Sequence, residues 1–246
     1  MRRAWRIGAW TLGALLMVIV TLSALVLLAG NTVRGRVWIE RATAHLSDGH
    51  IRLSGLSGSF PGAIDLEQLQ LADDRGVWLN AERISLRWSP LALLARHLKV
   101  ERLQLARLAI ERRPVSETSQ AGSRTGLPHI DIGQLSIDIL ELGPELTGVR
   151  ARLSIVGTTH VASLTEAAAS ITARRTDAPG DYEIRLRCDP SRVDATLRLE
   201  ESAGGALGNL LKLPGLGTLS VDANLNGPRQ AERLEVTVRA GELRAP

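Results

Sequence analysis

The sequence predicts a mainly β protein that follows one transmembrane helix, and three observations support this. The run from Gly8 to Gly30 contains no charged residue. Most of the chain after it alternates apolar with polar residues, which is the pattern of strands with one apolar face. Aromatic residues make up only 3% of the chain, so aliphatic side chains have to form that face. We therefore expect a long antiparallel sheet with short inserted helices.

The uncharged run is long enough to cross a bilayer. Its 23 residues span roughly 34 Å as a helix, against about 30 Å for the hydrocarbon core. Arg2, Arg3 and Arg6 precede it, and the positive-inside rule places them in the cytoplasm. A cleaved signal peptide is the competing interpretation, but its apolar region is usually about 7 to 15 residues long. We predict that residues 1–36 form a cytoplasmic N-terminus and an uncleaved signal anchor.

Charge, cysteine content and motifs argue against several functions. After residue 36 the chain carries 25 basic and 26 acidic residues, which gives no basic domain for nucleic acid. Cys188 is the only cysteine, and its phase in the strand pattern indicates a small buried hydrophobe. The five histidines lack metal-ligand spacing, and no nucleophile or phosphate-binding motif occurs. Asp73 and Asp74 lie in a typical turn sequence. We expect no enzyme activity, metal or cofactor.

The strand pattern is strictest in segments with an apolar residue at every second position: Ile84–Trp88, Val149–Ile155, Val193–Leu199, Leu219–Leu225 and Leu234–Val238. Three further segments alternate with a slip of one residue, which predicts a β-bulge or a turn. They are Ile64–Leu71, Leu103–Ile110 and Ile130–Leu142. Turn sequences separate the segments, which favours a meandering antiparallel sheet with one face in water.

Short helices interrupt the strands. Ser89 and Pro90 are typical of a helix start and predict a helix near residues 90–98. The apolar spacing of Gly205–Leu213 predicts another. We also expect the helix that follows the membrane segment to continue through Val37–Leu46.

Residues 116–126 have no apolar side chain except Ala121, which predicts a flexible loop. This loop divides the exported part into a β-region over residues 37–115 and a region of repeated strands over residues 127–246.

The pattern alone leaves open what covers the apolar face. A second sheet could pack on it, the sheet could curl on itself, or the face could bind another molecule. Periodicity by itself favours the first, a plain β-sandwich core. The shortage of aromatic residues and of helix argues against a normally filled core, however, and an open apolar surface is typical of a binding site.

Residues 53–114 resemble the N-terminal region of the TamB family. The resemblance is carried by the Gly58–Gly62 turn (GSFPG), Asp73–Leu79 (DDRGVWL), Trp88–Leu94 (WSPLALL) and Ile110–Pro114 (IERRP). The strand-and-turn sequence Leu225–Ala245 is similar to the repeats of the same family.

This resemblance implies an inner-membrane subunit of the translocation and assembly module, related to AsmA-like and bridge-like lipid transfer proteins. It implies a long curled sheet of the β-taco type, a groove that carries phospholipid through the periplasm between the inner and outer membranes. It also implies support for outer-membrane protein assembly through the β-barrel partner TamA. Family members are longer, so we expect a fragment or a truncated product without the domain that contacts TamA.

Two functions are consistent with these patterns. In the first, the apolar face binds phospholipid acyl chains, and the phase of the strands nominates as contacts Ile84, Leu86, Leu153, Ile155, Leu197, Leu199, Val221, Leu225, Val236 and Val238. In the alternative, the protein is a non-lipid scaffold or chaperone whose sheet edges pair with nascent outer-membrane β-strands. Both place the bulk of a single-pass inner-membrane protein in the periplasm.

Overall fold

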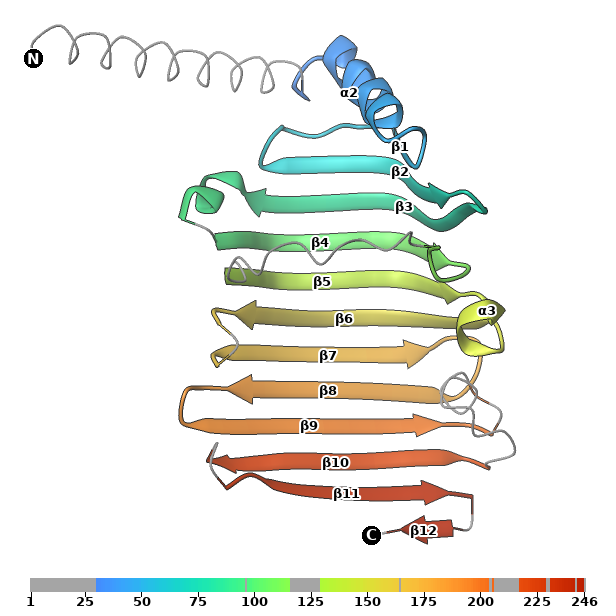
Figure 1. Ribbon diagram of the computed structural model, residues 1–246, viewed down its shortest axis with the longest axis vertical. Helices are drawn as coiled ribbons and strands as arrows, with labels where there is room; N and C mark the ends of the chain where they lie inside the picture. The colour runs from blue at the N-terminus through green and yellow to red at the C-terminus, as the bar shows by residue number, and fades with distance from the viewer. Residues whose placement is uncertain are drawn as a thin grey trace, which may run out of the picture.

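The computed structural model describes residues 30–95, 97–115, 129–163, 165–203, 205, 217–228, 231–241 and 243–245. Within these residues, twelve strands form one sheet in which spatial order follows chain order. The strands lie side by side in a single layer, with helix α2 at one end of the sheet and β12 at the other (Figure 1). The mainly β expectation is confirmed.

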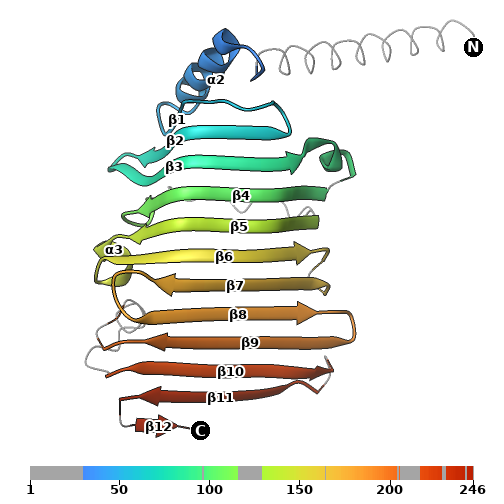
Figure 2. The same ribbon diagram turned by 180° about the vertical axis from the view of Figure 1, so that it is seen from behind.

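The elements follow one another in this order: α2 (Val33–Leu46), β1 (Ile51–Ser54), β2 (Ala63–Asp73), β3 (Gly76–Ser89), the 3₁₀-helix η1 (Pro90–Ala95), β4 (His97–Ile110), β5 (His129–Leu142), α3 (Pro144–Thr147), β6 (Ala151–Val161), β7 (Ala167–Arg175), β8 (Gly180–Cys188), β9 (Arg192–Glu201), β10 (Leu219–Pro228), β11 (Arg233–Ala240) and β12 (Leu243–Ala245). Seen from behind, the same single layer of strands runs from α2 to β12 (Figure 2).

One pair of strands departs from the expected antiparallel meander. β4 and β5 are parallel, with His97 opposite His129 and Ile110 opposite Leu142, whereas the other neighbouring strands are antiparallel. Parallel neighbours need a crossover, because a tight turn can join only antiparallel strands. The predicted loop at residues 116–126 lies in this connection and outside the described residues.

The predicted slips occur in several strands at the same level. At this level, two successive apolar residues of a strand are separated by three positions instead of the usual two. The neighbouring strands have the same spacing at the same place, so apolar residues stay opposite one another from β2 to β5. Strand β6 keeps the usual spacing of two residues, and the register therefore shifts between β5 and β6. Arg83, within the β3 step, has a φ of +49°, a left-handed conformation rare outside glycine. The matched steps are Leu66–Leu69, Ala81–Ile84, Leu105–Leu108 and Ile137–Leu140.

The helices differ in detail from the expectation. α2 includes the expected residues 37–46 but has its own start, capped by the Thr32 side chain. The helix expected near residues 90–98 is a 3₁₀-helix that ends at Ala95. Leu98 already belongs to β4, opposite Ile130, because strand pairing outweighs the weak stability of a short helix. The helix expected at residues 205–213 lies outside the described residues, apart from Gly205.

The predicted membrane segment also lies outside the described residues, apart from Gly30. In the part of the chain that the structure describes, no helix combines the length and the apolar character needed to span a membrane.

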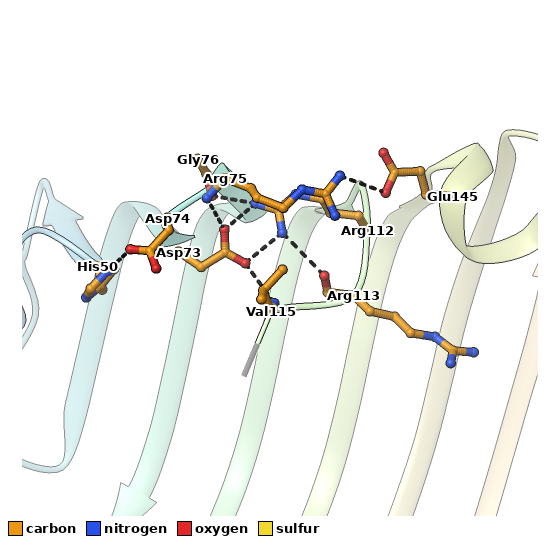
Figure 3. A network of polar contacts seen from close by, with 9 residues as sticks. All are labelled: His50, Asp73, Asp74, Arg75, Gly76, Arg112, Arg113, Val115 and Glu145. Carbon is orange, nitrogen blue, oxygen red and sulfur yellow. Dashed lines mark hydrogen bonds and ion pairs between the residues drawn. The ribbon is translucent and has the colours of Figure 1, made fainter. Parts of the chain in front are cut away.

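A buried ion pair fixes the hairpin between β2 and β3. The Arg112 guanidinium, whose side chain is 8% exposed, donates to Asp73 Oδ2 at 2.6 Å and to the Gly76 carbonyl at 2.9 Å. Asp73 also accepts hydrogen bonds from the backbone N–H groups of Arg75 and Val115, each at 2.9 Å (Figure 3). Asp73 therefore ties the turn to the chain that leaves β4, which confirms that this sequence is a turn.

Asp73→Asn should destabilise the protein at neutral pH, and the difference should shrink in acid. Hydrogen bonds from Arg112 hold the pKa of Asp73 below its ordinary value of 3.8. A lowered folded-state pKa contributes stability above the unfolded value, and this is lost as the pH falls through the folded value. Thermal unfolding of the full chain in detergent, followed by circular dichroism at pH 7, 5 and 3, measures the difference.

Asp74→Asn is the matched control. The Asp74 side chain is 89% exposed and lies 3.9 Å from His50 Nε2, so its loss should change the free energy of unfolding by about 0.5 kcal/mol or less. An equal loss for Asp73→Asn at all three pH values would contradict the electrostatic explanation.

Candidate functional site: the apolar face of the sheet

Cross-strand pairing gathers the apolar positions on one side of the sheet. Residues directly opposite each other on neighbouring strands project to the same face. Leu199, for example, lies opposite Tyr182 on β8 and Val221 on β10, and Val221 lies opposite Val238 on β11. Following such pairs from β3 to β11 shows that all the nominated lipid contacts share one face, which we call the apolar face: Ile84, Leu86, Leu153, Ile155, Leu197, Leu199, Val221, Leu225, Val236 and Val238.

The opposite face carries ion pairs between neighbouring strands. Glu141 accepts from Arg107 at 2.7 Å and from Arg152 at 3.0 Å, and Arg87 binds Asp65 at 2.9 Å. The hydrogen bond from Arg107 lowers the pKa of Glu141, which keeps this carboxylate ionised. We call this side the polar face.

The apolar face is open rather than the inside of a sandwich. The described strands form a single sheet, long and curled, and no large side chain among the described residues is fully buried. Most apolar-face residues are half-buried, and Ile184 and Val236 are 44% and 38% exposed. A closed core would bury such side chains almost completely. The sandwich that periodicity alone favours is therefore wrong, because no second layer exists in the described part.

One margin of the apolar face is more tightly packed. Ala151 is fully buried and Leu153 is 9% exposed, and Leu140 and Leu142 pack against them. Helix α3 lies at this margin (Figure 1), where Gly143, just before it, donates its N–H to the Ile110 carbonyl at 2.8 Å.

The same margin holds a buried polar cluster that sequence reasoning missed. Arg175 and Glu201 have side chains 5% and 1% exposed, and Arg175 Nη1 lies 3.3 Å from Glu201 Oε1. Arg175 also pairs with Asp177 at 3.0 Å, and the Tyr182 hydroxyl donates to Glu201 at 2.7 Å. Burial and this hydrogen bond raise the pKa of Tyr182. The sequence did contain a signal for this cluster, because Arg175 and Glu201 occupy positions that the alternation of their strands assigns to apolar residues.

Two smaller predictions concern reactive groups. Cys188 lies opposite Val193 on the apolar face, in phase with Ile184 and Leu186 as expected, and it is a half-buried free thiol. Among the described residues, no group of three or more His, Cys, Asp or Glu side chains could hold a metal ion. The aliphatic side chains of the apolar face can bury other apolar groups.

Comparison with known families agrees with this geometry. The model of the YdbH-like family, described as intermembrane phospholipid transport protein YdbH, matches residues 22–243. The chain belongs to the YdbH-like family. This supports the wider class of AsmA-like bridge proteins that the sequence resemblance implies, rather than TamB itself. No curated protein and no solved structure shows a significant match. Binding to TamA stays a prediction.

The apolar face of this YdbH-like chain thus has buried positions such as Leu153 and exposed positions such as Val236. A charge should be costly at the first and tolerated at the second. Leu153→Asp places a buried carboxylate opposite Arg175, which already pairs with Asp177 and Glu201, and it should lower the free energy of unfolding by about 3 kcal/mol or more. Val236→Asp leaves its carboxylate in water and should cost about 1 kcal/mol or less. Denaturant unfolding of the two variants in detergent measures the difference. Equally large losses in the free energy of unfolding would mean that Val236 is covered as well.

Proposed function

We propose that this protein carries phospholipid between the inner and outer membranes along its apolar face. The observation that supports the proposal is an uncovered aliphatic surface that continues from strand to strand. The YdbH-like family match agrees with it, because the description of that family is intermembrane phospholipid transport.

The dimensions of the sheet suit acyl chains. Neighbouring strands lie about 4.8 Å apart, so twelve strands provide a track roughly 50 Å long. Each methylene removed from water contributes about 0.8 kcal/mol, so aliphatic side chains alone can hold a lipid tail. No single residue binds strongly, and a lipid can therefore move along the track while its headgroup stays in water.

The protein is proposed to work from the inner membrane. The uncharged segment at residues 8–30, with arginines before it, would anchor it with the N-terminus in the cytoplasm. The sheet would then stand in the periplasm, with its first strands next to the lipid source.

Leu197→Asp should abolish lipid binding without unfolding the protein. Leu197 is half-buried on the apolar face, opposite Ile184 and Ala223, and a carboxylate there would have to lose water to contact an acyl chain. The full chain is purified from membranes, and bound phospholipid is counted by native mass spectrometry. We expect bound phospholipid in the unchanged protein and little in the variant.

Thr196→Asp is the matched control, since the neighbouring residue projects to the polar face, opposite Arg185 and Asn224. It should keep the lipid, and circular dichroism should show that both variants fold. The proposal would be refuted by an unchanged protein without lipid, or by a Leu197→Asp protein that binds as much lipid as the control.

The alternative function, a scaffold for nascent β-strands, requires a free strand edge. The outer side of β12 has no partner strand among the described residues. Pairing at that edge would use backbone groups, so a scaffold would still bind client strands after Leu197→Asp. The same variants therefore separate the two functions.

A further inference from the structure

Helix α2 has one face fixed to the start of the sheet. Arg36 donates from Nε to the Gly30 carbonyl and from Nη2 to the Gly58 carbonyl, both at 2.8 Å. On the next turn, Glu40 Oε1 accepts the N–H of Leu56 at 2.8 Å. Glu40 is the only acidic residue of the helix, and its carboxylate is held on the side of the helix that contacts Leu56.

The other face of α2 is apolar, aromatic and basic. Its residues fall within an arc of about 140° at 100° per residue. Val33 is 77% exposed and Trp38 66%, and no residue of the helix is buried. A hollow of about 320 Å³ lies between the side chains of this outward face, which consists of Val33, Arg34, Val37, Trp38 and Arg41.

The position of α2 relates it to the membrane. The uncharged segment ends at Gly30, three residues before the helix begins, and three residues reach about 11 Å at most. The connection is held in place, because the Asn31 side chain donates to the Phe60 carbonyl at 2.8 Å and accepts the Phe60 N–H at 3.1 Å. If the segment spans the bilayer, the outward face cannot be far from its surface.

We propose that the outward face of α2 lies on the surface of a bilayer that contains anionic phospholipid. Basic side chains next to exposed Val and Trp are the composition of helices that lie in the headgroup region. Arg34 and Arg41 contact the phosphates, and Val33, Val37 and Trp38 enter the boundary with the acyl chains. The absence of acidic residues from this face removes the charge that such a surface would repel.

This contact has a consequence for lipid entry. Helix α2 leads directly into β1, whose residues Ile51 and Leu53 lie opposite Leu71 and Leu69 of β2, and Ile51 is 37% exposed. A helix that lies on the bilayer would hold this end of the apolar face at the membrane surface. The inference rests on the anchored arrangement under the proposed function, and it adds a second, separate attachment.

The test measures how deeply α2 lies in the membrane. The full chain, with Cys188→Ser and Val37→Cys, carries a nitroxide label at position 37 and is reconstituted in vesicles of phosphatidylcholine with about 30% phosphatidylglycerol. Collision with a water-soluble nickel complex and with oxygen reports the environment of the label. We expect protection from nickel and access to oxygen at position 37. A label at Val156, 55% exposed on the polar face of β6, should be open to nickel.

Charge reversal provides the specific control. Arg34→Glu with Arg41→Glu should raise nickel access at position 37 toward that at position 156, since each arginine is worth about fivefold in surface occupancy. Access at position 37 equal to that at position 156 in the unchanged helix would overturn the inference. So would protection that persists in lipid-free detergent and grows with protein concentration, which would indicate a second copy of the chain on this face.

A separate readout distinguishes this inference from the proposed function. The charge-reversal variant leaves the apolar face unchanged, so phospholipid should still be found on it by native mass spectrometry. Free access at position 37 with lipid still bound would refute the membrane contact alone. An unchanged protein without lipid but with position 37 protected would refute lipid carriage and support the membrane contact.

Discussion

Strand register is the constraint on which the rest of this structure depends. Side chains alternate along a strand, so a slip of one residue in a single strand would turn its apolar side chains to the polar face. The chain contains several such slips, and they are matched from β2 to β5. Because neighbouring strands slip together, Leu69 stays opposite Ala81, and Ala81 stays opposite Leu108. A continuous apolar face exists only because these local irregularities agree.

An uncovered sheet must gain stability without a normal core. Here, polar contacts at the faces and margins join neighbouring strands in addition to the contacts between half-buried aliphatic side chains. Glu141 binds two arginines on the polar face, and Arg112 joins the β2–β3 turn to the end of β4. The buried Arg175–Glu201 pair lies at the ends of β7 and β9, beside the start of β8. These charged side chains pair with one another on the polar face or at the borders of the sheet. The middle of the apolar face therefore holds uncharged side chains.

The sequence predicted the strands and their phase well, because alternation is a local property. Leu197 and Val236 could be placed on a common face before any register was known. What covered that face could not be predicted, since periodicity describes one strand and says nothing of a second layer. The shortage of aromatic residues was the better guide. The parallel pairing of β4 and β5 was missed because a loop sequence does not show where the chain returns. Arg175 and Glu201 resembled ordinary polar strand ends until the register brought them together.

The apolar face is not equally exposed at all of its positions. Near β1, the helix α2 and the turns around Phe60 enclose the start of the sheet through hydrogen bonds to Gly30 and Gly58. At β11, Leu234 and Val236 are 63% and 38% exposed. An acyl chain therefore meets more water-exposed aliphatic surface beside Leu234 than beside Leu153, which is 9% exposed. Such differences can bias where lipid rests, but a directional flow needs a difference in lipid supply between the two membranes, because an equilibrium surface performs no work.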